Sequence, residues 1–183
     1  MRVNLSTTTI RNILVGLGVS ASLAGGGAFI ASQEGIVTHT YYDIAGVATN
    51  CVGNTHDVED DQVLTVEQCL ANFAEGLAET DAELSRLTAG VTLSEGERNA
   101  YRSFLYQYGA GAMRSSTLYR KLMSGHRLGA CLELTEACGK YGCNGWVYAG
   151  DSDKPVAGLV ARRAKEQQMC LDGIGIDTEA LGL

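Results

Sequence analysis

The sequence predicts an α+β protein that is mostly helical, with a small β-hairpin lobe and a helical lobe joined by a long helix, behind an N-terminal membrane segment. Three observations predict this architecture. Residues 13–31 carry no charged side chain, residues 34–56 alternate short β-prone pieces with glycines, and apolar residues recur at helical spacing over most of the remainder. A chain of 183 residues is long enough for one domain with appendages.

Charge and cysteine content narrow the class of protein. The formal net charge is −7, and no run of lysines or arginines occurs, which argues against nucleic acid as a partner. An anionic target would gain no electrostatic attraction from this charge. The six cysteines all lie beyond residue 31, and an even number in an exported chain favours disulfides. A zinc site is the weaker interpretation, because no Cys-x-x-Cys pair occurs and the three histidines are not at ligand spacing.

The uncharged segment Ile13–Ala31 is the candidate membrane segment. As one helix it would be about 28 Å long, close to the hydrocarbon thickness of a bilayer. Arg2 and Arg11 precede it, and no lysine or arginine follows until Arg86, so the positive-inside rule places the N-terminus in the cytoplasm and the rest across the membrane.

This segment is only weakly apolar, because 11 of its 19 residues are Gly, Ala or Ser. Three interpretations remain open from the residues alone. It is a cleaved signal peptide with Gly26 and Ala28 as the small residues before the cut, a permanent anchor, or a signal anchor that can leave the bilayer. The glycine content makes a permanent anchor a poor one.

Beyond the segment, the pattern predicts a hairpin and then helices. Thr38–Tyr42 and Val47–Asn50 are the β-prone pieces, and 57–61 is an acidic loop. Capping boxes at Thr65–Gln68 and Ser94–Glu97 open two helices. We expect helices over 65–87, from 94 to near Gly109, over 116–124, over 127–137, and from Pro155 in a first turn to Gly173, followed by a loose tail over 174–183.

Glu34, Asp43 and Thr49 are the candidate catalytic residues. Glycoside hydrolysis needs one protonated carboxyl that donates to the leaving oxygen and one ionised carboxylate, and two carboxylates that flank a hairpin can face one site. A nearby hydroxyl can hold the water. By itself, this spacing is weak evidence for a catalytic site, because an acidic chain contains many sets of Glu, Asp and Thr at similar spacing.

The residues around these three form a longer pattern. The chain resembles the phage lysozyme family, glycoside hydrolase family 24, whose signature runs Glu-Gly, Tyr-x-Asp-x-x-Gly and Thr-x-x-x-Gly-His-Thr. The matching stretches, in order, are Glu34–Gly35, Tyr42–Gly46, Thr49–Thr55, Ser103–Gly111, Ser116–Leu118, Lys121–Leu122, Gly158–Glu166 and Cys170–Leu171.

This resemblance implies a lysozyme-like fold and hydrolysis of the β-1,4 bond between N-acetylmuramic acid and N-acetylglucosamine in peptidoglycan, with no metal or organic cofactor. It makes Glu34 the general acid, Asp43 the base or electrostatic partner, and Thr49 the residue that orients water. The family is described as inverting, which fits a carboxyl separation of about 6.5–9.5 Å. Gln107 matches a polar substrate-binding position, and Arg163 (or Arg162) a basic residue that pairs with the acid.

The chain departs from the family pattern at three places. Asn54 replaces the usual His, and we expect a structural effect rather than lost chemistry, because Asn can still hydrogen-bond loop backbone. The second departure is at Asn50 and Val52, which surround a cysteine where other members of the family vary.

The third departure is the region 135–152, which carries Cys138, Cys143 and Trp146. Cys138 and Cys143 are expected to close a short disulfide loop. Trp146 is expected to pack rather than to serve as a sugar platform.

A weakly apolar segment fused directly to the catalytic Glu resembles the signal-anchor-release endolysins of lambdoid phages. This favours a releasable anchor, with residues 1–31 as the signal-anchor segment and 32–173 as the catalytic domain (32–64 the β lobe, 65–87 the connecting helix, 88–173 the helical lobe). The implied disulfides are Cys51–Cys69, Cys131–Cys170 and Cys138–Cys143.

The same resemblance implies a regulated enzyme. It is held at the host inner membrane facing the periplasm, inactive while tethered, and released to the periplasm after a holin collapses the membrane potential. Glu34 lies three residues after Ala31, so the bilayer would hold it within about 5 Å of the hydrocarbon edge, away from Asp43 and Thr49. No cysteine lies in 1–31, which excludes a thiol-exchange switch driven by the anchor.

Two rival functions remain at this point. A catalytically dead or weak lysozyme-like wall-binding protein is favoured slightly by Asn54 and the acidic surface. A lytic transglycosylase keeps the acid at Glu34 but needs no second carboxylate, so the importance of Asp43 separates it from a hydrolase.

Overall fold

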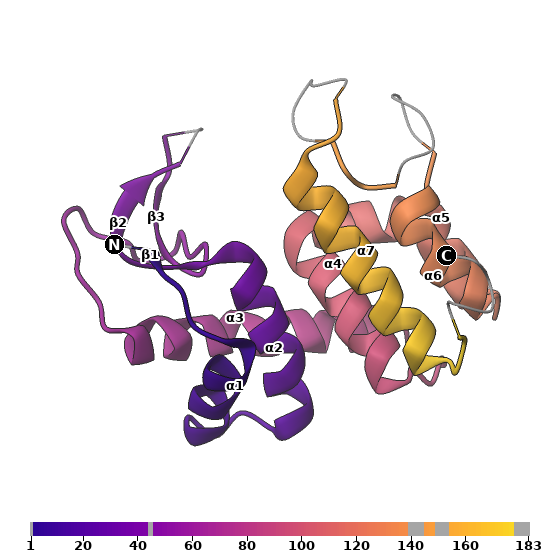
Figure 1. Cartoon of the computed structure of the whole chain (residues 1–183), viewed down its shortest axis with the longest axis horizontal. Helices are drawn as coiled ribbons and strands as arrows, with labels where there is room; N and C mark the ends of the chain where they lie inside the picture. The colour runs from indigo at the N-terminus through magenta and orange to yellow at the C-terminus, as the bar shows by residue number, and fades with distance from the viewer. Residues whose placement is uncertain (1, 44–45, 139–144, 149–153, 178–183) are drawn as a thin grey trace. The chain divides into compact units, whose positions relative to one another are not determined.

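The computed structural model describes residues 2–43, 46–138, 145–148 and 154–177 (Figure 1). The chain divides into two compact units, Met1–Ala82 and Glu83–Leu183. The division falls inside the long helix α3 (Val66–Leu87), which coincides with the connecting helix expected over 65–87.

Two helices, rather than one, follow the first strand of the first unit. α1 (Thr7–Gly16) ends at Leu17, and α2 (Ala21–Glu34) begins after Ser20, whose side chain accepts a hydrogen bond from the Leu23 amide. Gly18 lies between them at φ +89°, a left-handed conformation that glycine adopts without strain. In this structure residues 13–31 are therefore divided between two helices and do not form one continuous helix. None of the described helices is long and apolar enough to cross a bilayer.

The small residues of α2 allow it to pack closely on the rest of the first unit. Ala24, Ala28 and Ala31 are buried, and the Cα of Gly27 lies against Leu77 of α3. A Cβ on Gly27 would collide with the Leu77 side chain and would lie 3.2 Å from Leu14. The glycine thus lets α1, α2 and α3 share one core.

The described residues form a three-stranded antiparallel sheet in the order β1 (Arg2–Val3), β2 (Ile36–Tyr42), β3 (Ala48–Cys51). The predicted hairpin is β2 and β3. The strand β1 was not predicted, because a two-residue strand leaves no periodic pattern in the sequence. A disulfide joins Cys51 of β3 to Cys69 of α3, one of the pairs that the resemblance implies.

In the second unit, the described residues form four more helices. α4 (Glu95–Ser115) opens with the predicted capping box, in which Ser94 and Glu97 bond each other's backbone amides. Gly109, at φ +76° and ψ 169°, is not helical, so the helical backbone is interrupted at the predicted position and resumes to Ser115. The others are α5 (Thr117–Met123), α6 (Arg127–Glu136) and α7 (Ala157–Gly173).

The expected last helix is confirmed at its end, Gly173, but not at its start. Its N-cap is Val156, so Pro155 lies before the helix rather than in its first turn. The fixed φ of proline is equally compatible with this preceding extended position.

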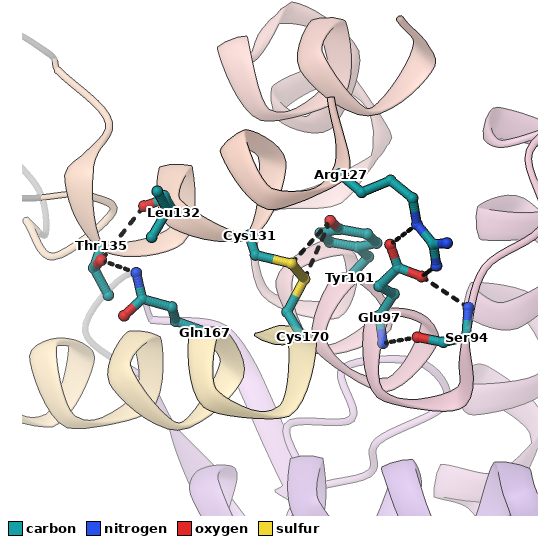
Figure 2. The surroundings of a disulfide bond; sticks show 9 residues. All are labelled: Ser94, Glu97, Tyr101, Arg127, Cys131, Leu132, Thr135, Gln167 and Cys170. Atoms are coloured by element: carbon teal, nitrogen blue, oxygen red, sulfur yellow. Dashed lines mark hydrogen bonds and ion pairs between the residues drawn. A yellow bond between two sulfur atoms is a disulfide. The ribbon is translucent and has the colours of Figure 1, made fainter. Parts of the chain in front are cut away.

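The core of the second unit surrounds the Cys131–Cys170 disulfide, the second implied pair (Figure 2). The hydroxyl of buried Tyr101 lies 3.2 Å from Cys170 Sγ. Nearby, Arg127 bonds the buried Glu97 carboxylate, with Nε 2.7 Å from Oε1. Burial opposes ionisation of Glu97, but hydrogen bonds from Arg127 and Ser94 hold its pKa below its ordinary value.

The third implied disulfide involves Cys143, which lies outside the described residues. The Cys138–Cys143 pairing therefore stays a prediction.

Two glycines of α2 provide a matched test of this packing. Gly27→Ala is expected to destabilise the purified full chain by about 1–3 kcal/mol, because the added methyl overpacks the α2–α3 contact. Gly25→Ala is expected to stabilise it by about 0.5–1 kcal/mol, because a Cβ there meets no described atom within 4 Å and only helix propensity changes. Urea unfolding measures both, and equal effects would contradict this packing.

Candidate active site

Glu34 is the last residue of α2 and is half-buried. The next residue, Gly35, has φ +82° and ψ 161°, a conformation that an L side chain rarely adopts, and β2 begins immediately after it. The Glu34 carbonyl accepts a hydrogen bond of 2.7 Å from Arg2 Nη2. The catalytic candidate therefore sits at a fixed helix-to-strand junction.

Asp43 follows β2 at the turn of the hairpin and is half-buried. Its carboxylate Oδ1 accepts from the Val47 amide at 2.9 Å, and its backbone exchanges further bonds with Val47 and Gly46. A carboxylate oxygen that accepts a hydrogen bond from a backbone amide is fixed in orientation.

Thr49 lies in β3 and is 3% exposed. Its hydroxyl donates to the Val47 carbonyl at 2.9 Å, so the Oγ1 lone pairs remain available as acceptors. The Val47 amide thus binds the Asp43 side chain, and the Val47 carbonyl binds the Thr49 side chain. Both candidate catalytic side chains are therefore held by the backbone of the same residue.

The hairpin strand β2, which lies between Glu34 and Asp43 in the sequence, is bulged. Nine residues of straight strand would separate Glu34 from Asp43 by about 30 Å, far beyond the 6.5–9.5 Å that an inverting hydrolase needs. Between the pairs Val37–Cys51 and Tyr41–Thr49, β2 has two more residues than β3. Extra residues of this kind bend a strand, so β2 is not a straight spacer between Glu34 and Asp43.

The segment 59–64 holds this bulge from outside the hairpin. Thr38 and Thr40 bond the backbone of Leu64 and Gln62, and the Thr40 hydroxyl donates to the Glu59 carbonyl at 2.6 Å. The Tyr42 hydroxyl donates to Asp60. This hydrogen bond and the Asp60 charge raise the pKa of Tyr42, so the contact persists through the neutral range.

Asn54, which replaces the family's usual His, serves as a loop brace. Its amide donates to the His56 carbonyl at 2.9 Å and to the side chain of Asn50 at 3.2 Å, and its backbone pairs with that of Asn50. The expected structural role for this residue agrees with these bonds.

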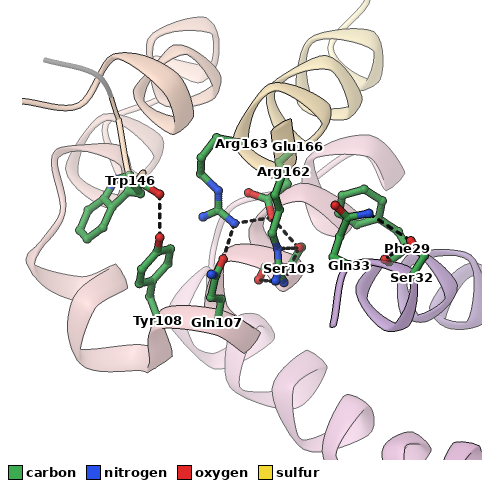
Figure 3. A network of polar contacts seen from close by, with 10 residues as sticks. All are labelled: Phe29, Ser32, Gln33, Ser103, Gln107, Tyr108, Trp146, Arg162, Arg163 and Glu166. Carbon is green, nitrogen blue, oxygen red and sulfur yellow. Dashed lines mark hydrogen bonds and ion pairs between the residues drawn. The ribbon is translucent and has the colours of Figure 1, made fainter. Parts of the chain in front are cut away.

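In the second unit, Gln107 and Arg163 contact each other, with Arg163 Nη2 2.8 Å from Gln107 Oε1 (Figure 3). Arg163 also reaches Glu166 at 2.7 Å, and Arg162 reaches Glu166 at 3.2 Å. Ser103 donates to Glu166 at 2.5 Å. Both arginines that could be the family's basic residue, Arg162 and Arg163, therefore bind the same carboxylate, that of Glu166.

The cluster of Ser103, Arg162, Arg163 and Glu166 is fully or almost fully buried. Burial raises the pKa of Glu166, whereas Arg163, the Ser103 hydrogen bond and Arg162 favour its ionised form. The Arg163 guanidinium also lies 5.1 Å from the Tyr108 ring centroid, and Trp146 packs edge-on to Phe104 at 5.0 Å. Trp146 therefore packs in this unit, as expected.

The structure brings Asp43 and Thr49 together at Val47, and Gln107 together with Arg163, whereas Glu34 precedes β2 and contacts Arg2. Glu34, Asp43 and Thr49 lie on successive elements of the first unit, and Gln107 and Arg163 meet in the second. Sequence reasoning missed the roles of Arg2, Ser103 and Glu166. The spacing Arg162-Arg163-x-x-Glu166 was a readable signal, since residues three and four apart on a helix are neighbours.

The phage lysozyme family model matches residues 31–166. This chain belongs to the phage lysozyme family. Within that family it is similar to the SAR-endolysin of Enterobacteria phage P21, with 35% identity over 167 aligned residues that cover 85% of this chain and 94% of that protein. The SAR-endolysin of Bacteriophage PS119 is 34% identical, with coverage of 85% and 93%.

Solved structures show the fold of the family in this chain. The active form of P1 phage endolysin Lyz superposes with a TM-score of 0.74 at 22% identity, covering 93% of this chain and 96% of that one. The endolysin from Escherichia coli O157:H7 phage FAHEc1 gives 0.68 at 24% identity, with coverage of 80% and 90%. The predicted lysozyme-like α+β fold, mostly helical with a small sheet, is confirmed.

Removing the shared carboxylate should be costly to the family fold. Glu166→Ala is expected to destabilise the protein by about 3–5 kcal/mol, because it leaves two buried guanidinium groups without their common anion. Lys165→Ala, at the exposed neighbouring position, should change stability by less than about 0.5 kcal/mol. Urea unfolding compares the two, and a Glu166→Ala variant as stable as Lys165→Ala would show that the cluster is energetically neutral.

Proposed function

We propose that this protein is a muramidase endolysin, which hydrolyses the β-1,4 bond between N-acetylmuramic acid and N-acetylglucosamine for host cell lysis. Membership of the phage lysozyme family and the relatives named SAR-endolysins support it. The observation that carries the mechanism is the pair of bonds from Val47 to Asp43 and Thr49.

In the proposed mechanism, Glu34 donates a proton to the glycosidic oxygen as the leaving sugar departs. Asp43 acts as base toward a water molecule on the opposite face of the sugar ring, so the anomeric configuration is inverted. The attacking water has two hydrogens, of which one goes to the Asp43 carboxylate and the other is accepted by Thr49 Oγ1. This arrangement turns the water's lone pair toward the anomeric carbon.

Gln107 and Arg163 are the proposed substrate-binding residues of the second unit. Gln107 is half-buried, whereas the Arg163 side chain is 0% exposed and is held by Glu166. We infer that Gln107 supplies the polar contact to the glycan and that Arg163 contributes through its charge and by holding Gln107.

Substitution of the two carboxylates tests the hydrolytic mechanism. Glu34→Gln is expected to lower kcat by about 10²–10⁴-fold, because general-acid catalysis is lost, and Asp43→Asn should have a similar effect. Thr49→Val, which keeps the shape but removes the acceptor, should lower kcat by about tenfold. Turbidity loss of permeabilised Gram-negative cells and release of reducing ends from purified peptidoglycan measure the rates.

The products separate the rival functions. A hydrolase leaves reducing N-acetylmuramic acid ends, whereas anhydro-muramic ends together with an active Asp43→Asn variant would identify a transglycosylase. A wild-type protein that binds peptidoglycan without cutting it would be a wall-binding protein and would overturn the proposal.

We further propose that the protein reaches the host inner membrane through residues 13–31, stays inactive there, and acts in the periplasm after release, with a holin as the functional trigger. Arg2 and Arg11 are the only charged residues before Glu34, which supports an N-terminus retained in the cytoplasm. The buried alanines and Gly27 of α2 support a released form in which this segment packs on the catalytic domain.

Raising the hydrophobicity of the segment tests this release. Gly25→Leu is expected to move most of the protein into the membrane fraction and to delay lysis, because a leucine favours insertion, and a Cβ at Gly25 meets no described atom within 4 Å. Gly25→Ser is the matched control and should release normally. Fractionation, intact mass and activity per molecule are the measurements. A membrane-held form as active as the soluble form, or loss of residues 1–28 from the mature protein, would contradict release.

A further inference from the structure

The N-terminus of the chain is part of the folded first unit. β1 pairs with β2 in the register Arg2–Val37 and Val3–Ile36, directly after the junction that carries Glu34. Arg2 Nη2 donates to the Glu34 carbonyl at 2.7 Å, and this carbonyl belongs to the last residue of α2. A cation at a helix C-terminus is favourable, because the final carbonyls carry partial negative charge and lack helical partners.

The contact also depends on the missing side chain of Gly35. A Cβ at Gly35 would collide with Arg2 Nε and lie 2.6 Å from Arg2 Nη2. The guanidinium therefore lies directly over the backbone that turns from α2 into β2. Arg2 and Gly35 together define how Glu34 leaves the helix.

This contact cannot exist while residues 13–31 span a bilayer. Arg2 would then be on the cytoplasmic side and Glu34 on the periplasmic side, separated by about 28 Å of helix. Strand partners instead lie about 5 Å apart between Cα atoms. The pairing of β1 with β2 thus requires that the N-terminus has crossed to the side of the catalytic domain.

We propose that Arg2 and β1 form a latch that closes only after release and that positions Glu34 for catalysis. Arg2 is a positioning residue in this proposal, since it acts through the backbone of Glu34. The same arginine has two roles in sequence: before release its charge retains the N-terminus in the cytoplasm, and after release it binds the end of α2. The proposal rests on the release and on the role of Glu34 proposed above.

Arg11 provides a matched control. It is the other basic residue before the segment, so its removal has the same effect on the charge that retains the N-terminus, but it is exposed on α1. In the purified soluble full chain, Arg2→Met is expected to lower kcat by about three- to tenfold with KM unchanged within about twofold, as expected for a displaced catalytic group. Arg11→Met should match the wild type, and Arg2→Lys, which keeps a charged donor, should recover part of kcat.

Hydrogen–deuterium exchange gives a readout that does not depend on activity. Arg2→Met should speed exchange in peptides covering residues 34–38, while peptides of α3 and Arg11→Met stay at wild-type rates. Wild-type kcat in Arg2→Met, or an equal loss in Arg11→Met, would overturn the latch. If the wild type shows no muramidase activity, the proposed function fails, and exchange alone then decides whether the latch exists.

Discussion

The junction at Gly35 is the constraint on which the first unit depends. α2 ends at Glu34, β2 begins at Ile36, and the single residue between them turns the chain at φ +82°. Because no flexible linker separates α2 from β2, any movement of α2 moves Glu34 relative to the hairpin. The position of the proposed general acid is therefore set by how α2 packs, and this packing depends on Gly27 against Leu77 and on the N-terminal strand against β2.

Much of this arrangement was predictable from the sequence, because it rests on local signals. The hairpin, both capping boxes and the connecting helix were predicted from β-prone runs, Ser/Thr-x-x-Glu/Gln patterns and helical periodicity, and the structure confirms them. The break in the helix after Gly16 was missed. Hydropathy shows how long an apolar segment is but not its backbone conformation, so it cannot distinguish one spanning helix from a helical hairpin. β1, the bulge in β2 and the anchor of Tyr42 on Asp60 depend on long-range pairing, which leaves no periodic trace.

The second unit faces a different physical problem, which is the burial of charge. Two arginines and one glutamate are almost fully enclosed, and such a group is costly unless each charge is bonded. Glu166 Oε1 collects bonds from Ser103, Arg162 and Arg163, and the Phe104 and Tyr108 rings flank Arg163. A cluster held in this way has few alternative arrangements, so the Arg163 guanidinium donates to the Gln107 side chain in one geometry. We interpret the role of the cluster as holding the substrate-binding residue Gln107 in place, rather than as adding to the free energy of unfolding.

The N-terminal segment must satisfy two environments, and its composition follows from both. In a bilayer, a segment in which 11 of 19 residues are Gly, Ala or Ser is only marginally stable, which permits exit. On the catalytic domain, the same small residues allow helices to approach closely, since Gly27 meets Leu77 with no room for a side chain. A leucine-rich anchor would satisfy the first environment and fail the second, because its bulk would prevent α2 from docking and so from delivering Glu34. The small residues of the N-terminal segment therefore account both for its low hydrophobicity in the bilayer and for its close packing on the catalytic domain. The proposed coupling of release to activity follows from this.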